Sequence, residues 1–197
     1  MPCIFRQSPY HAHGTHPSNL TTLETLDIYS LEPDDLLWAL PRLMLAWDGQ
    51  WFLKVHDEFD WETAARLNAR VRAAFGRIEM RTMLRALDKR YADDVPDAVR
   101  ILGTYIRKVF AAGFECDFRV SGDRLDAYVT KCAAWEGARH AALERTDQAC
   151  IACEELWIAW LKTLLPNRKI QFDIHWRMGY GDARCHFVLE FERMFDK

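Results

Sequence analysis

The sequence contains no apolar run of the ~20 residues that a membrane-spanning helix requires. It has no long block of basic residues either, and its net charge is −3 at pH 7. A nucleic-acid partner would require a cationic face, so that class of partner is not expected. Residues 1–16 lack the hydrophobic stretch of a secretory signal. We therefore expect a cytoplasmic protein with no nucleic-acid or membrane partner.

Common catalytic motifs are also absent. The sequence has no phosphate-binding glycine loop, no GxSxG and no HExxH. Its most glycine-rich stretch, residues 179–181, is explained by a turn. There is no low-complexity segment, and the only repeated pattern is a duplicated hairpin. Any chemistry must therefore come from residues that the fold brings together.

What is present is the composition of a globular protein with many aromatic residues. Half of the 197 residues are hydrophobic and 28% are charged, with 8 Trp and 11 Phe. Such a chain can bury a sizeable core, and its aromatic residues suit either that core or an apolar pocket. Residues 1–20 combine proline and glycine with His11, His13 and His16, which predicts a flexible N-terminal segment. We expect a single domain over residues 21–197.

Helical patterns fill the first half of this domain. Pro33, followed by Asp34 and Asp35, is typical of a helix start. Apolar residues then recur at helical spacing: Leu40, Met44, Trp47, Trp51 and Val55. Pro41 within this stripe predicts either a kink or a fresh helix start. A second helix is expected over 62–87, with an apolar face of Ala64, Val71, Phe75 and Ile78, and a third over 94–112 that stops at Gly113.

The apolar period changes to two at residue 114, which predicts a strand over 114–120. A two-residue turn at Gly122-Asp123 would begin a hairpin. This turn sets Val120 against Leu125, Phe118 against Ala127, and Arg119 against Asp126. All the apolar residues then lie on one face, as a correct register requires.

Two further helices are expected over 133–145 and 149–165, before a second hairpin of strands over 170–178 and 185–192. The order of N-terminal helices, hairpin, two helices and hairpin predicts an α+β fold. In that fold a four-stranded antiparallel sheet packs against helices on one face.

Four cysteines form the first candidate site: Cys132, Cys150, Cys153 and Cys185. Cys150 and Cys153 make a CxxC, whose two sulfurs can share one zinc or iron ion. Helix starts near Cys132 and Cys150 favour the thiolate, which is the form that binds metal or attacks as a nucleophile. Cysteine is also a small residue that is often buried, so the alternative is packing without chemistry. Cys116, on a core-facing strand position, is best explained by packing.

Carboxylates and histidines form two more candidate groups. Asp48 lies at the edge of the apolar stripe, and with Glu79 on the next helix it is a candidate for proton transfer. If Tyr180-Gly181 is the second turn, His175 faces His186 and Trp176 faces Cys185, with Cβ atoms ~5 Å apart. The histidines could then bind a metal or act as acid and base. The alternatives are a structural ion pair for the carboxylates and a solvated sheet face for the histidines.

Short motifs over roughly residues 35–192 resemble a DGxWF-type family of bacterial and archaeal cytosolic proteins. They are DGQWF at 48–52, IEMR at 78–81, VTKC at 129–132, the cysteine at 150, and GDARCHF at 181–187. The closing motif also looks like that of the L-2-amino-thiazoline-4-carboxylic acid hydrolase family. The element order is similar to the vinyl-reductase type of small-molecule-binding domain. His56 stands where the family pattern has an acidic residue.

This resemblance implies an enzyme that hydrolyses a cyclic amidine or a related non-peptide C–N bond. Cysteines would supply a nucleophile or bind zinc or iron, while Asp48, Glu79, His175 or His186 would move protons. The alternative is a non-catalytic ligand- or redox-sensing domain with a cysteine-bound metal. A third hypothesis is an accessory subunit in which the cysteines only pack. The expected partners are a small-molecule ligand or substrate and, if aromatic residues are exposed, a second copy of the chain.

Overall fold

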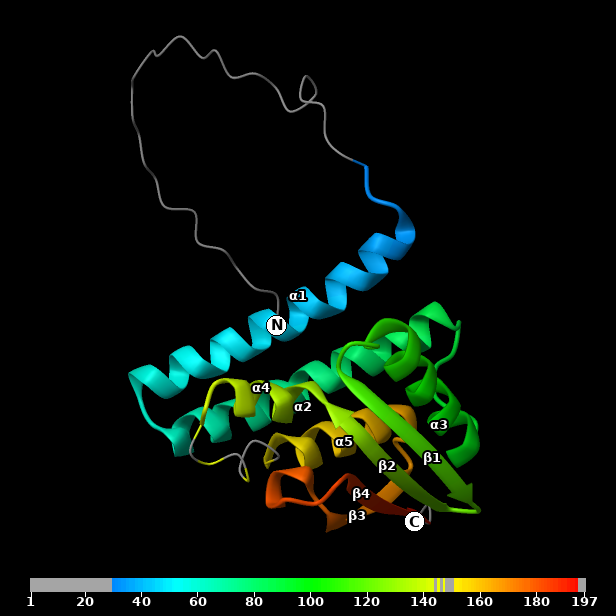
Figure 1. Ribbon diagram of the computed structural model, residues 1–197. Coiled ribbons are helices and arrows are strands. Elements are labelled where there is room, and N and C mark those ends of the chain that lie inside the picture. The colour runs from blue at the N-terminus through cyan, green and yellow to red at the C-terminus, as the bar shows by residue number, and fades with distance from the viewer. Residues whose placement is uncertain (1–29, 144, 146, 148–150, 195–197) are drawn as a thin grey trace, which may run out of the picture. The chain divides into compact units, whose positions relative to one another are not determined.

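The computed structural model describes residues 30–143, 145, 147 and 151–194 of the chain. Two long helices, α1 (Pro33–Glu58) and α2 (Trp61–Ala86), form a helical hairpin (Figure 1). α1 starts at Pro33 as expected and does not end at Pro41, which is buried within it. Asp60 caps α2, because its side chain accepts a hydrogen bond of 2.6 Å from the Thr63 backbone N–H. The cap and the short connection fix where the chain reverses.

The third α-helix ends before its predicted end and continues as a π-helical turn. α3 (Val95–Thr104) is capped by Asp94, and the chain continues into a π-helical turn, η2 (Tyr105–Val109). Gly113 follows, at a point where a Cβ atom would collide with the ring of Phe110. A regular helix over 94–112 is therefore wrong in its last part. The wider turn starts at Tyr105, a buried residue that belongs to the candidate site below.

The first hairpin forms as the sequence predicts. β1 (Phe114–Ser121) pairs antiparallel with β2 (Arg124–Cys132). The observed pairs include Val120 with Leu125, Phe118 with Ala127, and Arg119 with Asp126. Gly122 in the turn has a φ of 58°, a left-handed conformation that glycine adopts without strain. The expected register is confirmed.

The second half contains α4 (Ala133–His140), α5 (Ile151–Leu164), β3 (Arg168–Trp176) and β4 (Cys185–Arg193). The expected register of this second hairpin is wrong, because Trp176 pairs with His186 and not with Cys185. A short 3-10 helix, η4 (Met178–Tyr180), and Gly181 at a φ of 98° make the connection longer than a two-residue turn. The pairing is also irregular between Ile174 and Trp176, so β3 bulges at His175.

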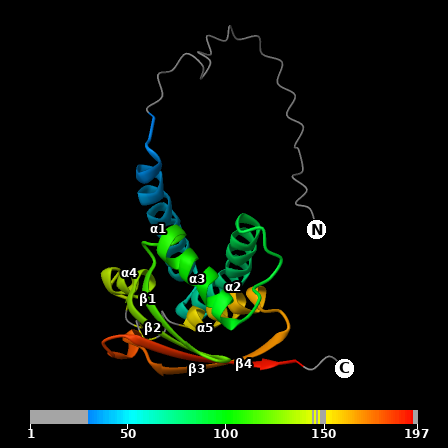
Figure 2. The ribbon, with the colours of Figure 1, turned by 90° about the vertical axis from the view of Figure 1, so that its right-hand side faces the viewer.

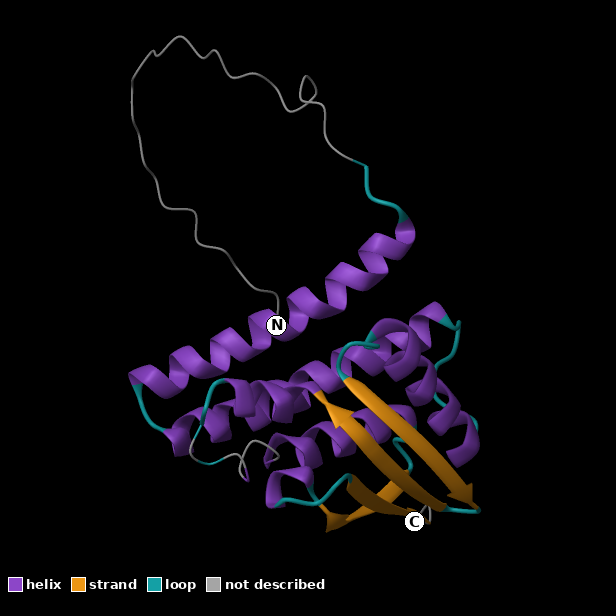
Figure 3. Cartoon of the chain, in the orientation of Figure 1, coloured by secondary structure: helices purple, strands orange, loops and turns teal. Residues whose placement is uncertain are grey.

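The four strands form one antiparallel sheet in the order β1-β2-β4-β3. Figure 2 shows the helices on one side of this curved sheet, and Figure 3 shows the same two layers by secondary structure. Trp157 and Trp160 of α5 are fully buried between the layers. Residues of β4 on both faces are buried, as expected for a central strand. The α+β fold, with a four-stranded antiparallel sheet packed against helices, is confirmed.

The two long helices do not bury the faces that their apolar patterns indicate. Of the predicted α2 face, Ala64 is buried but Val71, Phe75 and Ile78 are exposed, whereas Arg72 and Glu79 are buried. On α1, most of the apolar stripe is exposed as well. The inward face of α2 also buries Met80, Met83 and Leu84, and α5 approaches it closely at Gly76.

From Pro33 onward the chain is one compact unit, to which Ser30–Glu32 do not belong. The expected flexible segment, residues 1–20 with its three histidines, lies outside the described residues and stays a prediction. Within the described ranges, no helix combines the length and the apolar character needed to cross a bilayer.

Candidate functional site

A cavity of about 470 Å³ lies among α1, α2, α4 and the start of α5. Most of its lining is apolar or small: Leu45, Ala46, Gly49, Phe52, Leu53, Ala65, Ala133, Ala134, Gly137, Ala138, Ala141, Leu143 and Ala152. Its volume falls within the about 300–1,000 Å³ that is usual for small-molecule sites. The cavity is therefore large enough for an organic ligand.

Few lining residues carry charge or an amide, and four of these lie on adjoining α1 and α2. They are Asp48 and Gln50 of α1 and Asn68 and Arg72 of α2. Arg72 Nη1 and Asp48 Oδ2 are 3.8 Å apart, which is an ion pair but too long for a hydrogen bond. The Asn68 Oδ1 atom is buried and has no hydrogen-bond partner among the described residues. Hydrogen-bonding capacity is thus left over inside an apolar cavity.

Glu79 lies two turns beyond Arg72, on the same buried face of α2. Its two carboxylate oxygens accept hydrogen bonds of 2.5 Å, one from the Tyr105 hydroxyl and one from the Trp160 indole N–H. Burial, and then the nearby carboxylate, raise the pKa of Tyr105 far above its usual range. Tyr105 therefore stays a hydrogen-bond donor. This network joins α2 to η2 and α5.

The two predicted carboxylates, Asp48 and Glu79, thus have different surroundings. Asp48 lines the cavity, whereas Glu79 is held by two donors in the core. Arg72, which was not predicted, is ion-paired with Asp48 and lies two turns before Glu79 on the inward face of α2. The signal for it was present, because Asn68, Arg72, Gly76 and Glu79 follow one another at helical spacing.

Three of the four predicted cysteines lie in the described residues: Cys132, Cys153 and Cys185. Cys185 sits on β4 opposite Val129, three positions before Cys132 on β2, so Cys132 and Cys185 are about 10 Å apart along the sheet. Cys153 is partly buried on α5, and Cys150 lies outside the described residues. In the ranges that the structure describes, no group of three or more His, Cys, Asp or Glu residues could hold a metal ion. A zinc or iron site that uses Cys150 stays a prediction.

Two of these cysteines are next in sequence to residues that line the cavity. Cys132 precedes the lining residue Ala133, and Cys153 follows the lining residue Ala152. The Cys185 sulfur accepts a 3.4 Å hydrogen bond from the Met178 backbone N–H. Cys116 is buried, and burial raises the pKa of its thiol to about 12. A thiol of that pKa suits packing, as expected for Cys116.

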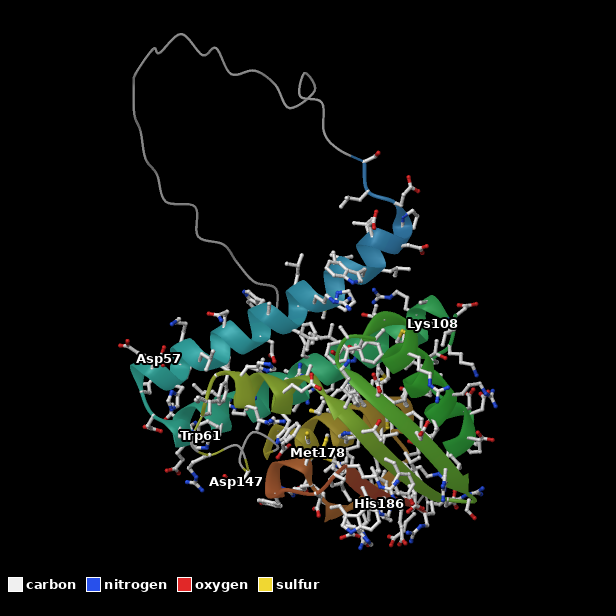
Figure 4. All side chains as sticks on the ribbon, viewed as in Figure 1. Asp57, Trp61, Lys108, Asp147, Met178 and His186 are labelled. Atoms are coloured by element: carbon white, nitrogen blue, oxygen red, sulfur yellow. The ribbon has the colours of Figure 1, made fainter. Side chains whose placement is uncertain are left out.

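The two predicted histidines meet on the sheet face opposite the helices. Their ring centroids are 5.0 Å apart, because the bulge at His175 turns it toward His186. His186, marked on β4 in Figure 4, also stacks on Tyr128 and contacts Trp176. Its Nε2 lies 2.8 Å from Asp126 Oδ1, while its buried Nδ1 has no hydrogen-bond partner among the described residues. The group is an aromatic cluster rather than a fully solvated polar face.

Asp126 anchors this cluster electrostatically. Two hydrogen bonds from Arg124, of 2.9 and 3.1 Å, and then the contact with His186, hold the pKa of the Asp126 carboxyl at about 2. The ordinary value is 3.8. Because the folded-state pKa is the lower one, the ionised carboxylate stabilises the fold above about pH 4, and this contribution is lost as the pH falls toward about 2.

We expect Asp126→Asn to lower the free energy of unfolding near neutral pH, with a difference from wild type that shrinks below about pH 4. Urea unfolding at several pH values measures that difference. Asp117→Asn on β1 is the control, because its 3.9 Å ion pair with Arg107 is exposed and should contribute less than about 1 kcal/mol. A difference for Asp126→Asn that stays constant down to about pH 3 would contradict the expectation.

Comparison of the sequence with protein families and with curated proteins finds no match. The resemblance to the thiazoline hydrolases therefore stays a prediction. Among solved structures, the chain is similar to the crystal structure of trafficking protein particle complex subunit 3 from Naegleria fowleri. That protein is covalently bound to palmitic acid. The TM-score is 0.53 at 8% identity, over 80% of this chain and 98% of that chain.

A second similar structure is an H-NOX protein from S. oneidensis in its Fe(II)NO state. Its TM-score is 0.43 at 16% identity, over 67% of this chain and 71% of that chain, and this likeness supports no further inference. The likeness to the trafficking subunit concerns the fold. By its fold, this chain is an α+β domain of the same architecture as that subunit.

Proposed function

We propose that this protein binds a small organic acid in the cavity among α1, α2 and α4, with the carboxylate of the ligand on Arg72. The proposal rests on the guanidinium group of Arg72, which is buried and has few partners among the described residues. Only 9% of Arg72 is exposed, and in the part of the chain that the structure describes its one ion pair is the 3.8 Å contact with Asp48. A buried arginine is normally paired, and its planar group of donors fits a carboxylate with two parallel hydrogen bonds.

The rest of the cavity suits the remainder of such a ligand. The alanine and leucine side chains favour an apolar body. The Asn68 oxygen, which has no hydrogen-bond partner among the described residues, can accept a hydrogen bond from a ligand N–H or O–H group. The fold likeness to a subunit that carries covalently bound palmitic acid supports the view that this architecture can enclose an organic ligand.

The test is thermal unfolding and calorimetric titration with benzoate, octanoate and 2-amino-thiazoline-4-carboxylate, each compared with its uncharged amide. Carboxylates should raise the melting temperature and amides should not. Arg72→Gln should weaken carboxylate binding about 10- to 100-fold, because a charge-assisted hydrogen bond in a buried site is lost. Arg70→Gln, an exposed arginine on the same helix, is the matched control.

Equal stabilisation by acids and amides would overturn the anionic ligand. Equal binding to Arg72→Gln and wild type would remove Arg72 as its receptor. Unfolding curves of both variants without ligand separate a binding defect from a folding defect.

Asp48 supports a second function, hydrolysis of a cyclic amidine. Its carboxylate lines the same cavity as Arg72, so a ligand with a cationic amidine and a carboxylate would find both counter-charges. Cys132 and Cys153, next in sequence to lining residues, would be the candidate nucleophiles. In the same titration, consumption of 2-amino-thiazoline-4-carboxylate supports the hydrolase. Binding without consumption supports a ligand-sensing domain.

A further inference from the structure

An apolar stripe on α1 faces solvent. Residues 36, 40, 43, 44 and 47 recur at helical spacing, and each is between 40% and 72% exposed: Leu36, Leu40, Leu43, Met44 and Trp47. On α2, three residues at the same spacing are between 36% and 54% exposed: Val71, Phe75 and Ile78. We call these eight residues the α1–α2 stripe. None of them lines the cavity that contains Asp48 and Arg72.

The two parts of the stripe are joined beside Trp51. This α1 residue lines a shallow groove of about 1050 Å³ along α2, together with Val71 and Ala74. Figures 1 and 2 show α1 diverging from α2 toward its N-terminal end, and residues 33–38 and 40 are exposed. A long helix that is apolar on its solvent side normally has a partner.

The size of the stripe matches what one partner contributes to a stable interface. From their exposed fractions, its eight side chains present about 800 Å² of surface, and a standard interface buries about 800 Å² on each partner. The largest apolar patch on a typical monomer is smaller, at about 300–600 Å². Trp47 is 72% exposed near the middle of the stripe, and tryptophan is enriched among residues that dominate binding energy.

The two helices that carry the stripe have net charges of opposite sign. α1 carries five acidic and two basic side chains, a net charge of −3, whereas α2 carries two acidic and six basic side chains, a net charge of +4. Exposed arginines flank the α2 part of the stripe: Arg70, Arg77, Arg81 and Arg85. An interface that places α1 of one copy against α2 of another would pair opposite charges at its rim.

From the area, the position and the charges of this face, we propose that the protein forms a symmetric dimer through the α1–α2 stripe. α1 of each copy packs on the hairpin of α1 and α2 of the other. A two-fold axis then uses the same patch twice, as self-complementary dimers require. The acidic, apolar α1 and the basic, apolar-striped α2 make the patch complementary to itself.

Sedimentation of the full chain over a range of concentrations tests this proposal. Wild type should be a dimer, and Trp47→Glu should weaken dimerisation at least about 100-fold, since it puts an unpaired charge into an apolar interface. Trp38→Glu is the matched control. Trp38 is also highly exposed, at 62%, and lies nine positions earlier on the same helix, which is half a turn away from the stripe. This variant should remain a dimer.

Ile78→Glu, on the α2 part of the stripe, is the second variant and should also be monomeric. All three side chains are exposed, so circular dichroism should show folded variants. A monomeric wild type would overturn the proposal, whether residues 1–29, another protein or a lipid surface covers the stripe. A dimer that survives Trp47→Glu and Ile78→Glu would overturn it too, as would equal dissociation of the Trp38 and Trp47 variants.

Discussion

Replacement of Glu79 by alanine is expected to lower the free energy of unfolding by about 3 kcal/mol or more. The carboxylate accepts hydrogen bonds from the Tyr105 hydroxyl and the Trp160 indole N–H, and all three side chains are buried. Its removal leaves two buried donors unsatisfied, at about 1–3 kcal/mol each. In a chain of this length the melting temperature should fall by about 6–12 °C.

Two milder variants make this result specific to the hydrogen bonds. Glu79→Gln keeps the shape and one acceptor oxygen, so it should cost less than Glu79→Ala. Tyr105→Phe removes a single donor and should cost about 1–2 kcal/mol. Chemical unfolding followed by tryptophan fluorescence measures all three. A Glu79→Ala protein within about 1 kcal/mol of wild type would show that the network does not stabilise the fold.

Gly76→Leu is expected to be destabilised by more than about 3 kcal/mol, or to be recovered only as aggregate. A Cβ atom at Gly76 would lie 2.9 Å from Leu156 Cδ1, 3.2 Å from Trp160 Cδ1 and 3.4 Å from Ala159 Cβ. All three belong to α5, so a leucine side chain would have to push α5 away from α2. Glu79 and Trp160, which hydrogen-bond across the same contact, would then separate.

Gly49→Ala and Gly76→Ala are the controls for this prediction. A Cβ atom at Gly49 on α1 meets nothing within 4 Å, so alanine there should stabilise the helix by about 1 kcal/mol. At Gly76 the same gain is opposed by displacement of the Leu156 methyl group, and the net change should be small. Thermal unfolding of the three variants gives the order. A Gly76→Leu protein as stable as wild type would mean that α2 and α5 do not need close contact.

The candidate site was only partly visible in the sequence. The sequence predicts Asp48, at the edge of an apolar stripe, and Glu79, on the next helix, as candidates, and the structure places one in the cavity lining and the other in the core. Arg72 was missed because an arginine within a helix is normally a solvated residue. Its burial follows from its neighbours on α1, α4 and α5, which no local pattern specifies.

The second hairpin shows a different limit. Alternation along each strand predicts which residues share a face, but register also depends on the length of the turn. The η4 turn and the bulge at His175 shifted the pairing by one position, so Trp176 is opposite His186. In the first hairpin the connection is the short Gly122-Asp123 turn, and the predicted register is correct.

By itself, the sequence determined the order of helices and strands, the α+β class and the register of the first hairpin, because each depends on residues close together in the chain. Only the tertiary structure decided which faces of α1 and α2 are buried. An apolar stripe predicts that a helix face will be covered, without stating by what. Here α5 packs at Gly76 and Glu79, on a face of α2 that buries Met80, Met83 and Leu84 together with Arg72. The apolar stripe is left on the solvent side, where a second copy of the chain can cover it.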